Sequence, residues 1–89
     1  MTRIDCFRWD FQYLAFHDGG DEITAVITRL PNYDRTDLTK VTEGDVLSFW
    51  RDAGRQSHEG DYLIVSAWAD EAACVRVLHA SAVSLSSTR

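Results

Sequence analysis

The pair Gly19-Gly20 constrains this chain most, because it lies between two segments that have the residue pattern of β-strands. Aromatic residues occupy every second position over 7–13, an alternation that gathers them on one face of a strand and would scatter them around a helix. Residues 23–28 are rich in β-branched side chains, which favour strands. Because only glycine takes positive φ without steric cost, the pair predicts the tight turn of a β-hairpin.

The letters Gly19-Gly20-Asp21-Glu22 also resemble the Gly-Gly-Asp-Glu-Phe signature of the diguanylate cyclase family, which lies on a hairpin. That resemblance implies a nucleotide above the glycines and a metal or phosphates at the acidic residues. However, Ile23 replaces the phenylalanine, 89 residues are far fewer than a cyclase domain needs, and no second acidic metal-binding segment precedes the hairpin. We therefore interpret the stretch as a turn with exposed charges at its tip.

The second half of the chain predicts a helix followed by two strands. Over residues 43–53 apolar side chains recur at helical spacing, after a capping threonine and before a terminating glycine. Residues 62–68 are apolar at nearly every position, which predicts a central strand buried on both faces. Residues 72–83 are compatible with a helix or a strand, and the alternation over 74–79 favours a strand.

These elements predict an α+β fold. Its sheet has four strands and is mainly antiparallel, the order along the chain is strand, strand, helix, strand, strand, and the helix packs on one face. We expect residues 1–89 to form a single domain, with a frayed tail over 84–89. The pattern leaves open whether the aromatic row over 7–13 faces the helix or forms an exposed patch.

Charge excludes one broad class of function. The chain has 14 acidic residues against nine basic ones and a net charge of −5. Binding to nucleic acid usually requires a basic surplus that displaces counterions, so we expect no direct nucleic-acid binding. No apolar run is long enough to span a bilayer, and we expect no membrane association and a cytoplasmic location in a bacterial or phage-infected host cell.

No motif for catalysis, a cofactor or a metal stands out, so we expect a non-enzymatic protein that binds none of these. Cys6 and Cys74 lack metal-ligand spacing and are interpreted as buried thiols. The group His58-Glu59-Gly60-Asp61 has acid–base or cation-binding chemistry, although such loops are usually solvated turns. A site built from distant residues stays open.

The leading hypothesis is a protein-binding inhibitor whose acidic loops and exposed aromatic residues dock on a basic nucleic-acid-binding site or subunit interface of a larger complex. Phage inhibitors of bacterial defence complexes, such as anti-CRISPR proteins, and immunity proteins share this composition, but no motif of any such family occurs here. The alternative is a homodimeric α+β enzyme or ligand-binding protein, with an aromatic pocket made by Trp9, Phe11, Tyr13 and Trp68. The candidate binding residues are the acidic Asp18, Asp21, Glu22, Asp34, Asp37, Glu43, Asp45, Glu59 and Asp61, and the aromatic Trp9, Tyr13 and Tyr33.

Overall fold

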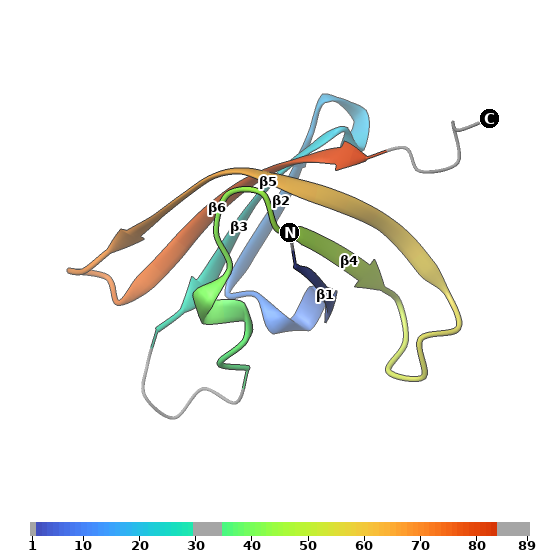
Figure 1. Cartoon of the computed structure of the whole chain (residues 1–89), viewed down its shortest axis with the longest axis horizontal. Coiled ribbons are helices and arrows are strands. Elements are labelled where there is room, and N and C mark those ends of the chain that lie inside the picture. Colours follow the sequence, from blue (N-terminus) through green and yellow to red (C-terminus); the bar gives the residue numbers. More distant parts are fainter. Residues whose placement is uncertain (1, 30–34, 84–89) are drawn as a thin grey trace.

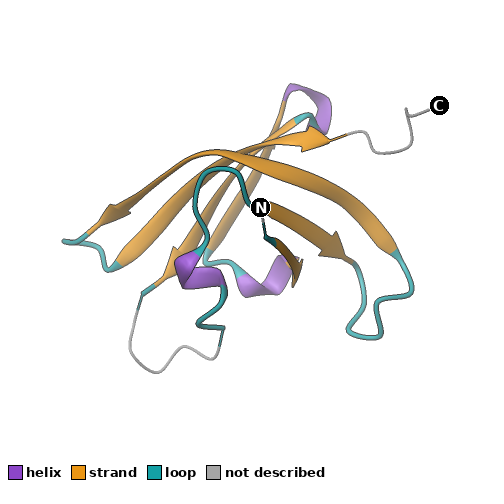
Figure 2. Cartoon of the chain, viewed as in Figure 1, coloured by secondary structure: helices purple, strands orange, loops and turns teal. Residues whose placement is uncertain are grey.

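A computed structural model describes residues 2–29 and 35–83 and shows a protein built almost entirely of β-strands (Figures 1 and 2). Three short 3₁₀ turns interrupt the strands, and no longer helix occurs in the described part of the chain. The strands are β1 (Arg3–Phe7), β2 (Tyr13–His17), β3 (Glu22–Thr28), β4 (Val46–Trp50), β5 (His58–Asp70) and β6 (Val75–Val83), and the 3₁₀ turns are η1 (Arg8–Asp10), η2 (Asp18–Gly20) and η3 (Leu38–Lys40).

The strands form one mixed six-stranded sheet in the order β1-β4-β5-β6-β3-β2. The β1–β4 pair is parallel and the other neighbouring pairs are antiparallel. The long strands β5 and β6 are bent, so the sheet curves and encloses a concave side (Figure 1). Strands β1 and β2 are therefore the two edges of the sheet.

The concave side, called here the inner face, holds the hydrophobic core. Pairing register places Ile64, Ala80 and Ile23 in one inner row across β5, β6 and β3. The segment 35–45 covers this face by inserting Leu38 and Val41, both almost fully buried. It is anchored where the Arg76 Nε–H donates to the Val41 carbonyl oxygen at 2.9 Å. A loop thus covers the face for which the sequence predicted a helix.

The predicted α+β fold is wrong, because residues 46–50 form strand β4 and no helix spans 43–53. Leu47 and Ser48 do not belong to the apolar stripe of the predicted helix. Both are fully buried, because β4 lies between β1 and β5. The supposed helix start is a turn in which the Asp45 carboxylate accepts a hydrogen bond from the Thr42 N–H at 3.1 Å. Gly44 has a φ of +93° there, a conformation that a helix does not contain.

The predicted first strand over 7–13 is also wrong. Strand β1 ends at Phe7, and η1 turns the chain so that β2 begins at Tyr13 at the opposite edge of the sheet. The aromatic residues consequently separate. Phe11 is buried against Phe49 with ring centroids 5.5 Å apart, whereas Trp9 is 63% exposed.

The hairpin prediction is confirmed in its turn and its second strand. Strands β2 and β3 pair antiparallel, and Gly19 and Gly20 have φ values of +70° and +99° in the connection. The strand predicted over 62–68 lies inside β5, which has a neighbour on each side. The expected burial on both faces is wrong, because Val65 and Trp68 are exposed. The ambiguous last element is strand β6. The predicted frayed tail over 84–89 lies outside the described residues.

Within residues 2–29 and 35–83, no helix is long and apolar enough to cross a membrane.

Candidate protein-interaction surface

The convex outer face carries an apolar row that crosses four adjacent strands. Register pairs Tyr13 of β2 with Val26 of β3, Val26 with Val77 of β6, and Val77 with Trp68 of β5. Tyr13 is 55% exposed, Trp68 is 46% exposed and the two valines are half-buried. Exposed apolar side chains are normal when solitary, but a contiguous set of them marks an interaction site. These four residues are called the outer row below.

A shallow hollow of about 320 Å³ lies beside the outer row, lined in part by Val65, His17, Thr24 and His79. The His17 Nε2 atom lies 3.0 Å from the Thr24 hydroxyl, which holds the imidazole against the sheet. Trp68 meets the His79 ring edge to face, with centroids 5.0 Å apart. Because Val65 is 51% exposed, the hollow extends the apolar surface sideways from the outer row.

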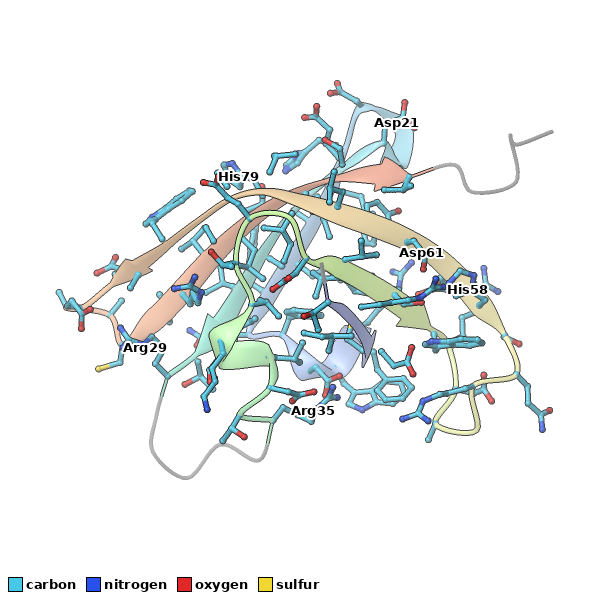
Figure 3. All side chains as sticks on the ribbon, in the orientation of Figure 1. Asp21, Arg29, Arg35, His58, Asp61 and His79 are labelled. Carbon is cyan, nitrogen blue, oxygen red and sulfur yellow. The ribbon has the colours of Figure 1, made fainter. Side chains whose placement is uncertain are left out.

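Three of the predicted acidic residues border this surface at the β2–β3 hairpin. Glu22 lines the hollow, and Asp18 and Asp21 are exposed at the tip. The Asp21 carbonyl oxygen accepts a hydrogen bond from the Ala82 N–H at 2.7 Å, which fixes the tip beside the end of β6 (Figure 3). Among the residues that the structure describes, these three carboxylates form no ion pair. Their charge is therefore not neutralised by any ion pair with the described residues.

Most other predicted acidic residues interact inside the protein. The Arg35 guanidinium hydrogen-bonds the Asp37 carboxylate and lowers the pKa of that group. Asp45 accepts hydrogen bonds from backbone N–H groups, including that of Thr42. Glu43 is exposed in the same turn. Asp34 lies outside the described residues.

Glu59 and Asp61 lie on opposite sides of β5 and are both largely buried. The Arg8 guanidinium donates two hydrogen bonds to Glu59, at 3.1 and 3.0 Å, and these bonds lower the pKa of the Glu59 carboxyl group. Asp61 pairs with Arg3 at 3.0 Å, and its side chain is only 3% exposed. Neither carboxylate is placed to meet a partner.

Of the predicted aromatic residues, only Tyr13 belongs to the outer row. Trp9 stacks on Phe7, with centroids 4.7 Å apart and nearly parallel rings, near the β1 edge. Tyr33 lies outside the described residues. Of the four residues expected to line an aromatic pocket between two copies, Phe11 is buried in the core of the single chain, whereas Trp9, Tyr13 and Trp68 are exposed.

A polar cluster covers the other half of the outer face, over β1, β4 and the start of β5. The His58 Nε2 atom lies 3.0 Å from the Ser48 hydroxyl and 2.9 Å from the Asp61 carboxylate (Figure 3). Arg3 closes the group by bonding Asp61. Beside it, the Trp50 indole N–H donates to Asp5 at 3.1 Å and its ring lies against His58.

This serine, histidine and aspartate do not form a nucleophilic triad. Such a triad requires the serine and the aspartate on different ring nitrogens, so that one nitrogen takes the proton while the other is held. Here Ser48 and Asp61 share Nε2, and Ser48 is fully buried. Nowhere in residues 2–29 and 35–83 do three metal-binding side chains of the His, Cys, Asp or Glu type come together. The hydrogen bonds of the cluster link β1, β4 and β5.

A second cleft, of about 220 Å³, lies at the margin of the concave inner face. Phe16, Phe49 and Tyr62 form its aromatic side, and Arg8 lies 4.8 Å above the Phe16 ring. Burial raises the pKa of the Tyr62 hydroxyl group. The cleft is smaller than the roughly 300–1,000 Å³ typical of small-molecule sites, and Glu59 already holds the Arg8 guanidinium.

The sequence did not single out Val26 and Val77 as binding residues, although the alternation of Val75 and Val77 around Arg76 indicated a strand. Trp68 was interpreted as a core residue because its side chain is large and the core is small, and it was a candidate only for the alternative aromatic pocket. Comparison of the chain with protein-family models, curated proteins and solved structures finds no significant match. The function must therefore be inferred from the geometry of the molecule.

Proposed function

We propose that this protein is a non-catalytic binding protein that docks on another protein through the outer row and the adjacent hollow. The observation that carries the proposal is the apolar row Tyr13–Val26–Val77–Trp68, which is continuous across four strands and exposed at both ends. Exposed aromatic side chains supply large contact area at low entropic cost, and they are enriched in protein interfaces.

Charge narrows the class of partner. Asp18, Asp21 and Glu22 border the apolar surface without internal counterions among the described residues, and the whole chain carries a charge of −5. A partner surface with an apolar centre and a basic rim complements this arrangement and is attracted to it over distance. The nucleic-acid-binding site of a host complex is such a surface, so the proposed effect of docking is to block that site.

The test is affinity capture from a bacterial host lysate with the full chain as bait and mass spectrometry as the readout. We expect a stoichiometric partner that the Tyr13→Lys/Trp68→Lys double variant loses. Lysine at both ends of the outer row removes the apolar contact and repels a basic rim. Trp9→Lys is the matched control, since Trp9 is the more exposed aromatic residue and lies outside the row.

Loss of the partner with Trp9→Lys but not with the double variant would move the interface to the β1 edge and refute the proposal. A second bait, with Asp18→Asn, Asp21→Asn and Glu22→Gln together, tests the acidic rim alone. It should bind the same partner more weakly, and the difference from wild type should shrink as salt screens the charges.

The alternative of a ligand-binding protein or enzyme has less support. The aromatic-walled cleft at Phe16, Phe49 and Tyr62 is small, and its arginines already pair with Glu59. The polar cluster around Ser48 lacks the arrangement that nucleophilic catalysis needs.

A further inference from the structure

The two edges of the sheet differ in how their backbone is protected. At the β1 edge, the Asp5 carbonyl oxygen accepts a hydrogen bond from Arg35 at 2.7 Å, and the Phe7 N–H donates to Asp10 at 2.8 Å. Arg35 is itself held by Asp10 and Asp37. Charged side chains therefore cover this edge, which is how natural sheets prevent pairing with another chain.

The backbone of β2 has no such protection, although the Arg8 guanidinium lies 4.8 Å from the centre of the Phe16 ring. Among residues 2–29 and 35–83, no side chain hydrogen-bonds to the backbone of Tyr13–His17. The strand reads Tyr-Leu-Ala-Phe-His and contains no lysine, arginine, acidic residue, proline or glycine. Tyr13, Phe16 and His17 are exposed along it. An uncharged apolar edge of this kind is a template for a further strand.

We propose that β2 pairs antiparallel with β2 of a second copy of this chain, so that two sheets join edge to edge in a two-fold symmetric dimer. The inference goes beyond the proposed docking function, although Tyr13 and His17 belong to both surfaces. It uses the backbone of one strand, whereas docking uses the side chains of the outer face.

A second copy fits because the strand is complementary to itself. A two-fold axis through Ala15 sets Tyr13 opposite His17 and Leu14 opposite Phe16, and each contact occurs twice. Leu14 and Phe16 both point to the inner face, since register pairs them with the core residues Ala25 and Ile23. The pairing thus joins apolar to apolar side chains on the inner face and places no charges opposite each other.

The first test is sedimentation equilibrium of the full chain from about 10 µM to about 1 mM, the range in which a weak interface of this size is expected to associate. Wild type should shift from monomer to dimer. Ala15→Glu and Ala15→Lys should each stay monomeric, because the symmetry axis sets two like charges together. An equal mixture of the two variants should dimerise again.

Trp68→Lys is the control that separates edge pairing from contact between outer faces, and it should dimerise like wild type. A wild type that stays monomeric throughout would overturn the proposal. A dimer that Trp68→Lys abolishes but Ala15→Glu does not would overturn it too. Salt separates this association from docking, since it screens the repulsion between two acidic copies but weakens attraction to a basic partner.

A covalent test does not depend on charged variants that could disturb folding. In a Cys74→Ser background, Ala15→Cys should form an intermolecular disulfide under mild oxidation, because directly opposed strand residues bring their Cβ atoms within about 5 Å. Cys6 does not compete, since burial raises the pKa of its thiol well above the usual range. Thr24→Cys, on the neighbouring interior strand, is the matched control. Equal crosslinking of both would contradict edge pairing.

Discussion

The two halves of the outer face contain similar residue types, which are buried or hydrogen-bonded in one half and exposed in the other. Over β1, β4 and the start of β5, Ser48 and Asp61 are buried, and Trp50 has an acceptor for its indole N–H in Asp5. Over β2, β3, β6 and the end of β5, Trp68 contacts His79, and among the described residues its indole N–H meets no acceptor. The first is called the sealed half and the second the open half.

The difference shows that side chains from the neighbouring strands determine whether an aromatic residue on this face is exposed. In the sealed half, Arg3, His58 and Asp61 come from two strands that flank β4, and their mutual bonds cover Ser48. In the open half, the side chains beside the outer row are Thr24, His17 and Val65, which leave a hollow. The open half is the one whose apolar surface no side chain of the described residues covers, which is why we propose it as the docking surface.

The largest expected effect of a single substitution is in the sealed half. Asp61→Ala should lower the free energy of unfolding by about 3 kcal/mol, because it removes the buried carboxylate that Arg3 and His58 share, and these two side chains are the ones that bond the buried Ser48. Urea denaturation followed by tryptophan fluorescence measures this. Glu22→Ala in the open half is the control, and its effect should stay within about 0.5 kcal/mol. Equal losses for both variants would remove the distinction between the halves.

A smaller effect is expected at the turn of the open half. Gly19→Ala should cost about 1 kcal/mol, since an alanine is strained at positive φ. The cost is conformational and not steric, because a Cβ at Gly19 would meet no atom within 4 Å. Gly19→Asn should cost less, as asparagine tolerates this region better. A loss for asparagine as large as that for alanine would contradict a purely conformational cause.

The pH dependence of stability should come from the carboxylates that are paired internally. Hydrogen bonds from Arg8 lower the pKa of Glu59 below its ordinary value of 4.5 in the folded protein. The stability that Glu59 contributes is therefore present above that pH and is lost as the pH falls through the folded-state pKa. Glu59→Gln should flatten the acid limb of the stability curve. An unchanged acid limb would show that Glu59 is not paired in solution.

A small stability effect is expected in the outer row itself. Tyr13→Ser should change the free energy of unfolding by less than about 1 kcal/mol, because only a half-exposed cross-strand pair with Val26 is lost. The same denaturation experiment measures it beside Asp61→Ala. A loss of several kcal/mol would mean that the ring supports the fold and is not held out for a partner.

How far the sequence predicts this molecule depends on whether the deciding contacts are local. The Gly19-Gly20 turn and the tip charges Asp18 and Asp21 were predictable, because adjacent residues alone determine a positive-φ turn. Strand β4 was not predictable, since its local pattern fits a helix and only the distant strands β1 and β5 turn it into a strand.

Trp68 shows the same limit for the candidate site. Tyr62 and Ile64 point to the inner face, and simple alternation would place Trp68 there as well. A register shift between Ile64 and Ser66 moves the later residues of β5 to the opposite face, and the extra residue is the exposed Val65. No local signal in the apolar run marks that bulge, so the outer row emerges only when the strands are paired.

The three tryptophans allow one direct measurement of the central claim that the open half binds a partner. Their indole N–H signals in a ¹H–¹⁵N spectrum report separately on the β1 edge (Trp9), the sealed half (Trp50) and the outer row (Trp68). On addition of the partner isolated with the wild-type bait, the Trp68 signal should shift or broaden while those of Trp9 and Trp50 stay in place. An unchanged Trp68 signal beside a perturbed Trp9 or Trp50 signal would contradict the account.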